Sequence, residues 1–170
     1  GHSMVMQDEG YWIPYNSVAS NRTQMISNTE IKDLIKATKS KHVLVISDGL
    51  FQGESFIESE NYVKDEGDAV AFYNLLEGLN GRQTITSNNT KPIKSDGETS
   101  VFAQYIIKFL ELNKKSLLAT HELFDLIKYP ISANSPNNPK FGHLQDANHE
   151  GGQFIFPLYV EPTQEPEKPK

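Results

Sequence analysis

The sequence predicts an α/β fold in which helices cover both faces of a mainly parallel sheet, as a three-layer α/β/α sandwich. Strand patterns and helical patterns alternate along the chain, which is typical of this class. The strand expected at His42–Ser47 is apolar without alternation, as in a strand covered on both faces. The expected helices carry apolar side chains at helical spacing. The 170 residues are enough for one domain with a substantial core.

The first third of the chain predicts an extended segment, a helix and the buried strand. Gly10–Tyr15 is aromatic and broken by a proline, which suits a hairpin or a strand on the surface of the core. Ser27–Glu30 has the S-x-x-E spacing of a capping box, so a helix is expected to begin there and to end near Ser40. The strand His42–Ser47 follows this helix.

The middle of the chain predicts a long loop, a helix and a short strand. Phe51–Gly67 is polar and acidic with little periodicity, and we expect a mobile loop there. Apolar side chains at helical spacing predict a second helix over Asp68–Leu79. Arg82–Thr86 is expected to form a short strand, and Ser87–Glu98 is rich in turn residues.

The last third predicts two helices and a closing strand. Ser100 caps an apolar helix, and Thr120 caps another that Pro130 is expected to end. Gln153–Tyr159 is expected to be the last strand. Residues 161–170 hold no apolar side chain to bury, so we expect a disordered Pro/Glu-rich tail or a linker.

Composition excludes several classes of function. A net charge of −6 without a basic stripe argues against nucleic-acid binding. The chain holds no cysteine, which excludes disulfides, thiolate metal sites and a thiol nucleophile. No apolar run approaches the roughly 20 residues that cross a bilayer, so we expect a soluble protein away from membranes, with the cytoplasm favoured. Residues 1–4 look like an expression scar, and we set them aside from the fold.

The segment Lys41–Phe56, KHVLVISDGLFQGESF, combines a buried strand with a tight turn. It resembles the nucleophile loop of the caspase and metacaspase cysteine peptidases, which usually reads like VSDSCFSG. Four residues match this pattern: Ser47, Asp48, Phe51 and Gly53. Gly49 and Gln52 replace serines, and Leu50 stands where the resemblance places the nucleophilic cysteine.

The resemblance to bacterial caspase-like domains extends over residues 5–160. Gly10–Pro14 is similar to the segment after the catalytic histidine loop, and Arg82–Ser87 is similar to the strand that opens the small subunit. FGHLQDANHEGGQFIF, at Phe141–Phe156, is similar to the closing YGPLRNAGHEGGDFIF stretch. The resemblance implies a partial caspase-like fold, made of the end of the large subunit and the whole small subunit. The first strands of the sheet, including one that ends in Ser-Gly-His-Gly, have no counterpart.

The residues do not supply the chemistry of that family. The isobutyl side chain of Leu50 cannot form a thiolate, and none of the five histidines lies in a Ser-Gly-His-Gly context. We therefore expect no catalytic residue and a pseudoenzyme that serves as an interaction or regulatory module. One alternative is an endopeptidase that needs a complementing His-bearing segment or an unexpected nucleophile. Another is a purely structural part of a larger protein.

The resemblance also suggests a peptide pocket at Asp48 and Ser87. In metacaspase-like relatives the aspartate that matches Asp48 accepts a basic side chain. The simpler interpretation is that Asp48 forms an Asx-turn with the backbone of its own loop. No metal or cofactor is expected, because the acidic loop lacks calcium-binding spacing. The expected partners are a protein or peptide, a second copy joined through Gln153–Tyr159, or a complementing chain. An unpaired edge of the Lys41–Ser47 strand would suit such partners.

Overall fold

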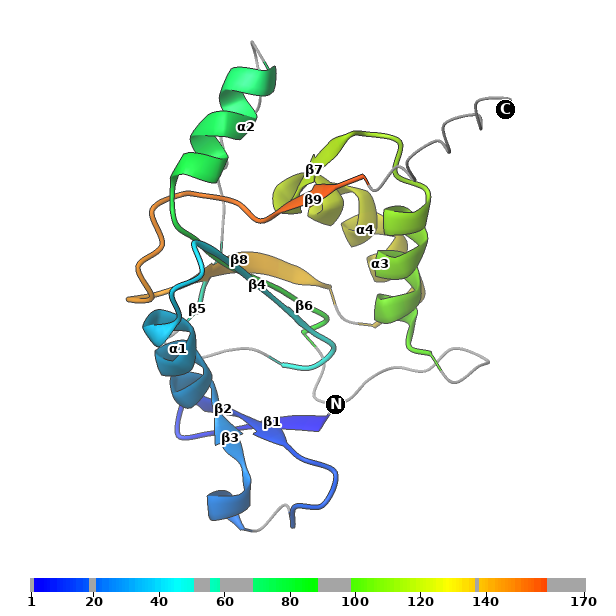
Figure 1. The fold of residues 1–170 in the computed structure, drawn as a ribbon. Coiled ribbons are helices and arrows are strands. Elements are labelled where there is room, and N and C mark those ends of the chain that lie inside the picture. Colours follow the sequence, from blue (N-terminus) through cyan, green and yellow to red (C-terminus); the bar gives the residue numbers. More distant parts are fainter. Residues whose placement is uncertain are drawn as a thin grey trace, which may run out of the picture.

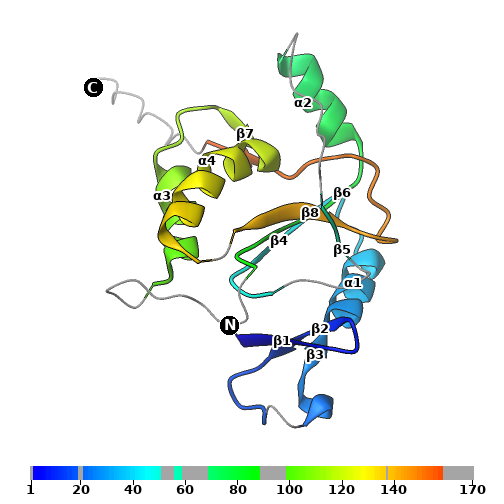
Figure 2. The same cartoon turned by 180° about the vertical axis from the view of Figure 1, so that it is seen from behind.

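A computed structural model describes residues 2–18, 21–50, 56–58, 69–88, 99–136 and 138–158. In these ranges the chain forms a mixed α/β structure, in which helices surround a central sheet and a smaller sheet lies at the N-terminal side (Figure 1, Figure 2). The predicted α/β class is confirmed at this level. The predicted tail, 161–170, lies outside the described residues.

The central sheet has four strands in the order β4-β6-β8-β5. They are β4 (His42–Ser47), β5 (Phe56–Glu58), β6 (Gly81–Thr86) and β8 (Lys140–Leu144). The β4–β6 pair is parallel, whereas β8 runs antiparallel to both β6 and β5. Three of the four strands thus run in the same direction, as a mainly parallel sheet predicts, but two of the three neighbouring pairs are antiparallel because β8 lies between two strands that run opposite to it.

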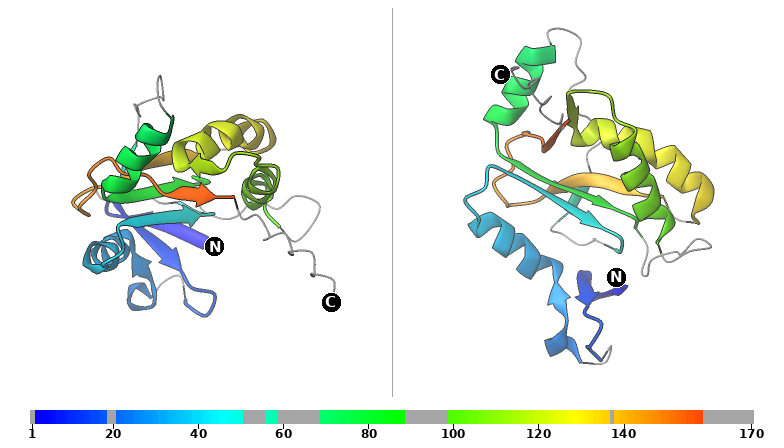
Figure 3. Two further views of the ribbon diagram at one scale, coloured as in Figure 1. Left: turned by 45° about the horizontal axis from the view of Figure 1, so that its top comes forward. Right: turned by 45° about the vertical axis from the view of Figure 1, so that its right-hand side comes forward.

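Helices pack on both faces of this sheet (Figure 3). On one face α1 (Asn28–Ala37) places Ile35 in a cluster with Val43 and Val45 of β4. On the other face α3 (Val101–Glu111) and α4 (Thr120–Asn134) form the larger cluster around Ile85 of β6. The side chains of Leu44 and Val45 point to opposite faces because side chains alternate along a strand.

The helix α2 (Ala69–Gly78) lies in the predicted range, 68–79. It precedes β6 directly, as the alternating pattern predicted. The expected mobile loop over residues 51–67 contains the short strand β5, and its other residues lie outside the described ones.

A separate antiparallel sheet contains β1 (His2–Met6), β2 (Glu9–Ile13) and β3 (Ile26–Ser27). Residues 2–4, which look like part of an expression scar, nevertheless pair with β2, and Ser3 is only 6% exposed. The capping box of α1 forms as predicted. The Ser27 Oγ accepts from the Glu30 amide, and the Glu30 carboxylate accepts from the Ser27 amide.

The helix α4 continues through Pro130 to Asn134, so the prediction that Pro130 ends it is wrong. Two side chains stabilise this turn: the Ser132 hydroxyl donates to the Lys128 carbonyl, and the Asn134 amide donates to the Pro130 carbonyl. Proline costs a helix one hydrogen bond. Here Ile131 is fully buried in the main cluster, and its packing favours continuation.

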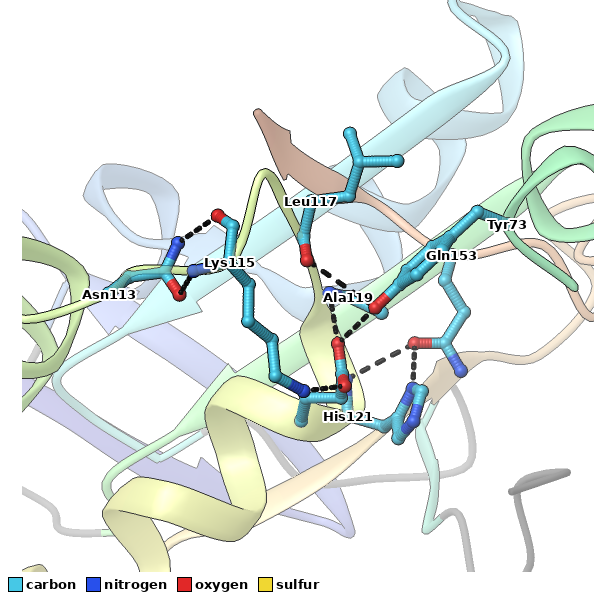
Figure 4. Close-up of polar contacts among 8 residues, drawn as sticks. Tyr73, Asn113, Lys115, Leu117, Ala119, His121 and Gln153 are labelled. Carbon is cyan, nitrogen blue, oxygen red and sulfur yellow. Dashed lines mark hydrogen bonds and ion pairs between the residues drawn. The ribbon is translucent and has the colours of Figure 1, made fainter. Parts of the chain in front are cut away.

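The helix α4 begins one residue earlier than predicted, with Ala119 as its N-cap (Figure 4). The Glu122 carboxylate accepts hydrogen bonds from the Ala119 amide and the Tyr73 hydroxyl, and it forms an ion pair with Lys115. Partial burial opposes the ionisation of Glu122, but these hydrogen bonds outweigh it and lower the pKa of this carboxyl. The Thr120 hydroxyl donates to the Phe154 carbonyl instead of capping the helix.

The closing segment forms β9 (Ile155–Pro157), which pairs with β7 (Leu117–Ala119). Within the described ranges β9 is therefore not part of the central sheet, whose antiparallel member is β8. The prediction of a last strand is right in position, and sequence reasoning missed β8. None of the helices in the described ranges is long and apolar enough to cross a membrane.

Candidate functional site

The loop that resembles a nucleophile loop begins where β4 ends, beside the end of β6. The Ser87 amide donates to the Ser47 carbonyl at 3.0 Å, and the Thr86 hydroxyl donates to the Gly49 carbonyl. Because Thr86 is fully buried, this contact fixes the start of the loop to the sheet. The structure describes this loop as far as Leu50. Phe51, Gln52 and Gly53 lie outside the described residues.

Leu50 is buried rather than presented to a cleft. Its side chain is 8% exposed, and its amide donates to the Ser3 hydroxyl of β1 at 2.8 Å. In an acyl-transfer enzyme, backbone amides beside the nucleophile stabilise the oxyanion that forms during attack. The Leu50 amide is already bonded to Ser3. This position therefore offers hydrocarbon in place of a nucleophile and an amide that is not available to a substrate.

A pocket of about 430 Å³ lies between the N-terminal sheet and the end of β4. The apolar part of its lining comes from β2, β3 and β4, and Asp48 stands in its wall. The full lining is His2, Ser3, Trp12, Ile13, Pro14, Ile26, Ile46, Ser47, Asp48 and Gly49. The pocket is thus mainly apolar with one carboxylate at its side, and it suits an apolar group better than a charged one.

The structure separates the two residues of the predicted peptide pocket. Asp48 lines the pocket with part of its carboxylate buried. Ser87 is completely buried and does not line it. Among the described residues the Ser87 hydroxyl has no hydrogen-bond partner. Only Asp48 therefore reaches a surface that a peptide could touch.

Sequence reasoning missed His2, which lies in the same pocket as Asp48 and Gly49. The histidine belongs to β1, the strand that pairs with the Gly10–Ile13 part of β2. The sequence Gly1-His2-Ser3-Met4 looks like an expression scar, which hides this histidine from sequence reasoning. The signal that could have found it is its place shortly before Gly-Tyr-Trp-Ile-Pro, the segment similar to the one after the family's histidine loop.

Two other histidines form a structural pair at the opposite end of β6. The rings of His143 and His149 stack with centroids 4.6 Å apart, and the Arg82 amide donates to Nδ1 of His149. The pKa of His149 is lowered to about 4, mostly by partial burial and in addition by the charges of His143 and Arg82. Partial burial also lowers the pKa of His143. Both rings are therefore neutral near pH 7, and His149 acts as an acceptor for the backbone.

The remaining histidines also hold the fold together. Nε2 of His42 lies 2.9 Å from the Leu79 carbonyl, and Nδ1 of His121 lies 2.8 Å from Oε1 of Gln153 (Figure 4). Neither residue lines the pocket that contains His2. In the part of the chain that the structure describes, no three His, Cys, Asp or Glu side chains gather as they would around a metal ion.

Comparison of the chain with models of known families, with curated protein sequences and with solved structures gives no match.

Proposed function

We propose that this chain is a catalytically inactive caspase-like domain that acts as an interaction or regulatory module. The observation that carries the proposal is the state of Leu50: a buried isobutyl group stands at the nucleophile position, and β1 holds its amide. A carbon side chain cannot attack a carbonyl or carry an acyl group. The loop therefore keeps a peptidase-like layout without the step that defines a cysteine peptidase.

The arrangement of the central sheet supports the caspase-like part of the proposal. Strands β4 and β6 are parallel neighbours, the nucleophile-like loop follows β4, and helices pack on both faces. These features suit a three-layer α/β/α sandwich in which β4 and β6 lie side by side.

A peptidase assay tests the proposal directly. The chain is incubated with fluorogenic peptides that end in arginine or lysine, with and without calcium. We expect no turnover above buffer. Turnover that disappears in both the His2→Ala and Asp48→Ala variants would overturn the proposal, whereas turnover that both variants retain identifies a contaminating protease.

The alternative function is an endopeptidase that is active only with a complementing segment or an unexpected nucleophile. The position of His2 in the pocket favours keeping this alternative. The Leu50→Cys variant tests it, since a thiol is the group that the loop lacks. Hydrolysis that appears in this variant and is lost when His2→Ala is added would support a dormant site. The same result from the unmodified chain would support the alternative itself.

A further inference from the structure

The segment that joins β8 to β9 passes beside the start of β6 (Figure 1, Figure 3). Ala147 and Gln153 anchor it, since Ala147 is fully buried and Gln153 is only 5% exposed. Residues 148–152, which we call the latch segment, lie between these anchors, and all of them except Gly152 are exposed or half-buried. Separation of the latch segment from β6 therefore does not require either anchor to leave the core.

Four described hydrogen bonds join the latch segment to the chain where β6 begins. The amides of Glu150 and Gly152 donate to the Asn80 carbonyl, at 2.9 and 3.2 Å. In return the Asn80 amide donates to the Glu150 carboxylate at 2.9 Å. The Arg82 amide donates to Nδ1 of His149 at 3.1 Å. Two of these bonds therefore depend on side-chain acceptors that take up protons in acid.

The bond between Arg82 and His149 exists only while the imidazole ring is neutral. A backbone amide is always a donor, so Nδ1 of His149 must keep its lone pair and the single ring proton lies on Nε2. A second proton would make Nδ1 a donor as well, and two donors would then face each other across 3.1 Å. Protonation thus converts this contact from an attraction into a repulsion.

The charged and titratable groups that face His149 also oppose its protonation. Arg82 of β6 carries a permanent positive charge, and the His143 ring of β8 stacks on the His149 ring with centroids 4.6 Å apart. Within the described ranges neither histidine forms an ion pair with a carboxylate. Glu150 is the adjacent acid of the latch segment, and its carboxylate already accepts from the Asn80 amide. A proton on either ring is therefore repelled by Arg82 and by a proton on the other ring.

Acid therefore favours the form in which the latch segment has left β6. In the closed form the pKa of His149 is lowered to about 4, whereas a ring exposed to water has an ordinary pKa of about 6.5. Between these two values the open form binds a proton that the closed form does not bind. Each decrease in pH through this range consequently shifts the equilibrium toward the open form.

We infer that residues 148–152 form an acid-sensitive latch, which leaves the start of β6 when the stacked His143 and His149 rings take up protons and returns at neutral pH. The rest of the fold stays intact, because a local opening breaks only the few hydrogen bonds of one segment. The open form presents the Asn80 carbonyl and the Arg82 amide to solvent. This inference does not depend on the proposed function, since it involves neither a partner nor the loop after β4.

Amide hydrogen exchange measured by NMR between pH 7 and pH 4.5, corrected for the intrinsic exchange rates, tests the latch. The Arg82, Glu150 and Gly152 amides should lose protection by about threefold to tenfold per pH unit, as expected for the uptake of one proton. The Phe154 amide, which donates to Gln83 beyond the latch segment, should keep its protection. Constant protection of the latch amides would overturn the inference. An equal loss at Phe154 would also overturn it, because the opening would then be global.

Variants separate the two histidines from a general effect of acid. His143→Phe keeps a stacked ring without its charge, so the latch amides should lose protection less steeply as the pH falls. His149→Asn removes the titrating acceptor and should abolish most of the pH dependence. His42→Asn is the matched control, because Nε2 of His42 donates to the Leu79 carbonyl and a second proton leaves that bond in place. A pH dependence as steep in His143→Phe and His149→Asn as in His42→Asn would contradict the inference.

Discussion

In the neighbouring strands β4 and β6, the degree of burial is the reverse of what their composition predicts. The β6 sequence, GRQTIT, is mostly polar, and every one of its residues is buried. The β4 sequence, HVLVIS, is mostly apolar, and its residues are half-buried or exposed. Position in the sheet explains the reversal, since β6 lies between β4 and β8 whereas β4 is at the edge. Burial here follows strand order rather than side-chain hydrophobicity.

Polar side chains are tolerated in β6 because most of them bind backbone groups of neighbouring segments. The Arg82 guanidinium donates to the carbonyls of Ser40, Lys41 and Gly81, and Gln83 accepts from the Phe154 amide. Buried polar groups are stable when they are paired in this way. These contacts hold the turn before β4 and the segment before β9, whereas the described side-chain contacts of β4 to backbone carbonyls are limited to that of His42 with Leu79.

The largest loss of stability is expected from Arg82→Leu. The variant removes three hydrogen bonds from a charged group to backbone carbonyls, at about 1.5–3 kcal/mol each, although the Lys41 carbonyl keeps the Gly81 amide as a donor. We expect a decrease of about 4 kcal/mol in the free energy of unfolding, measured by urea denaturation. Arg22→Leu is the control, because Arg22 is exposed over the Tyr11 ring and should cost less than about 1 kcal/mol. Equal effects of the two variants would contradict the role assigned to Arg82.

The next largest effect is a difference in stability between variants of two isoleucines, which are partners in the β4–β6 register. Ile85 is fully buried and Ile46 is 42% exposed. Ile85→Ala should cost about 3 kcal/mol because it leaves a cavity in the main cluster. Ile46→Ala should cost about 1 kcal/mol or less because little buried area is lost. Chemical denaturation of the two variants measures the difference, and similar losses would show that the edge of β4 is covered.

A smaller effect is expected where β6 holds the loop after β4. Thr86→Val keeps the shape of the side chain and removes the hydroxyl that donates to the Gly49 carbonyl. We expect a loss of about 1–2 kcal/mol, since a buried acceptor loses its donor. Exchange of the Leu50 amide should also become faster as the loop loosens. An unchanged exchange rate would mean that the contacts of Ser3 and Ser87 are enough to hold the loop. Thr84→Val is the matched control, because the Thr84 hydroxyl has no partner among the described residues.

The smallest effect is the pH dependence of stability that His149 causes beside the first residues of β6. The His149 ring must be neutral to accept from the Arg82 amide, and its pKa in the fold is lowered to about 4. Below the ordinary pKa of about 6.5 the unfolded chain binds more protons than the folded one. Stability should therefore decrease from about pH 6.5 to about pH 4, by about 1 kcal/mol once solvent screening is allowed for.

Thermal unfolding at pH 7 and pH 4.5 checks this dependence. The His149→Asn variant keeps an oxygen acceptor but does not titrate, so the decrease should be smaller than in the unmodified chain. An unaltered decrease in the variant would assign the pH dependence to other groups.

Local patterns predicted the parts of the fold that depend on neighbouring residues. The capping box at Ser27 and the strand at His42–Ser47 were found because their signals lie within a few residues. The strand β8 was missed because its sequence, KFGHL, is short, and its antiparallel place between β6 and β5 depends on distant partners. The helix through Pro130 was missed because burial of Ile131 outweighed a local rule.

The candidate site was predictable only in part for the same reason. The loop at Asp48–Leu50 was visible because it follows its strand directly in the sequence. The contact of Ser3 with the Leu50 amide joins residues from opposite ends of a long segment, and no periodicity reveals it. Burial of Ser87 follows from the strand order of the whole sheet, which the sequence near Ser87 does not contain.

One peptide group joins the two sheets of this protein. The carbonyl of Gly49 is held by Thr86 of the central sheet, and the amide of the same linkage, contributed by Leu50, is held by Ser3 of the N-terminal sheet. A peptide plane is rigid, so tilting it to favour one contact strains the other. Force applied to β1 would therefore be transmitted to the end of β6 through this planar group.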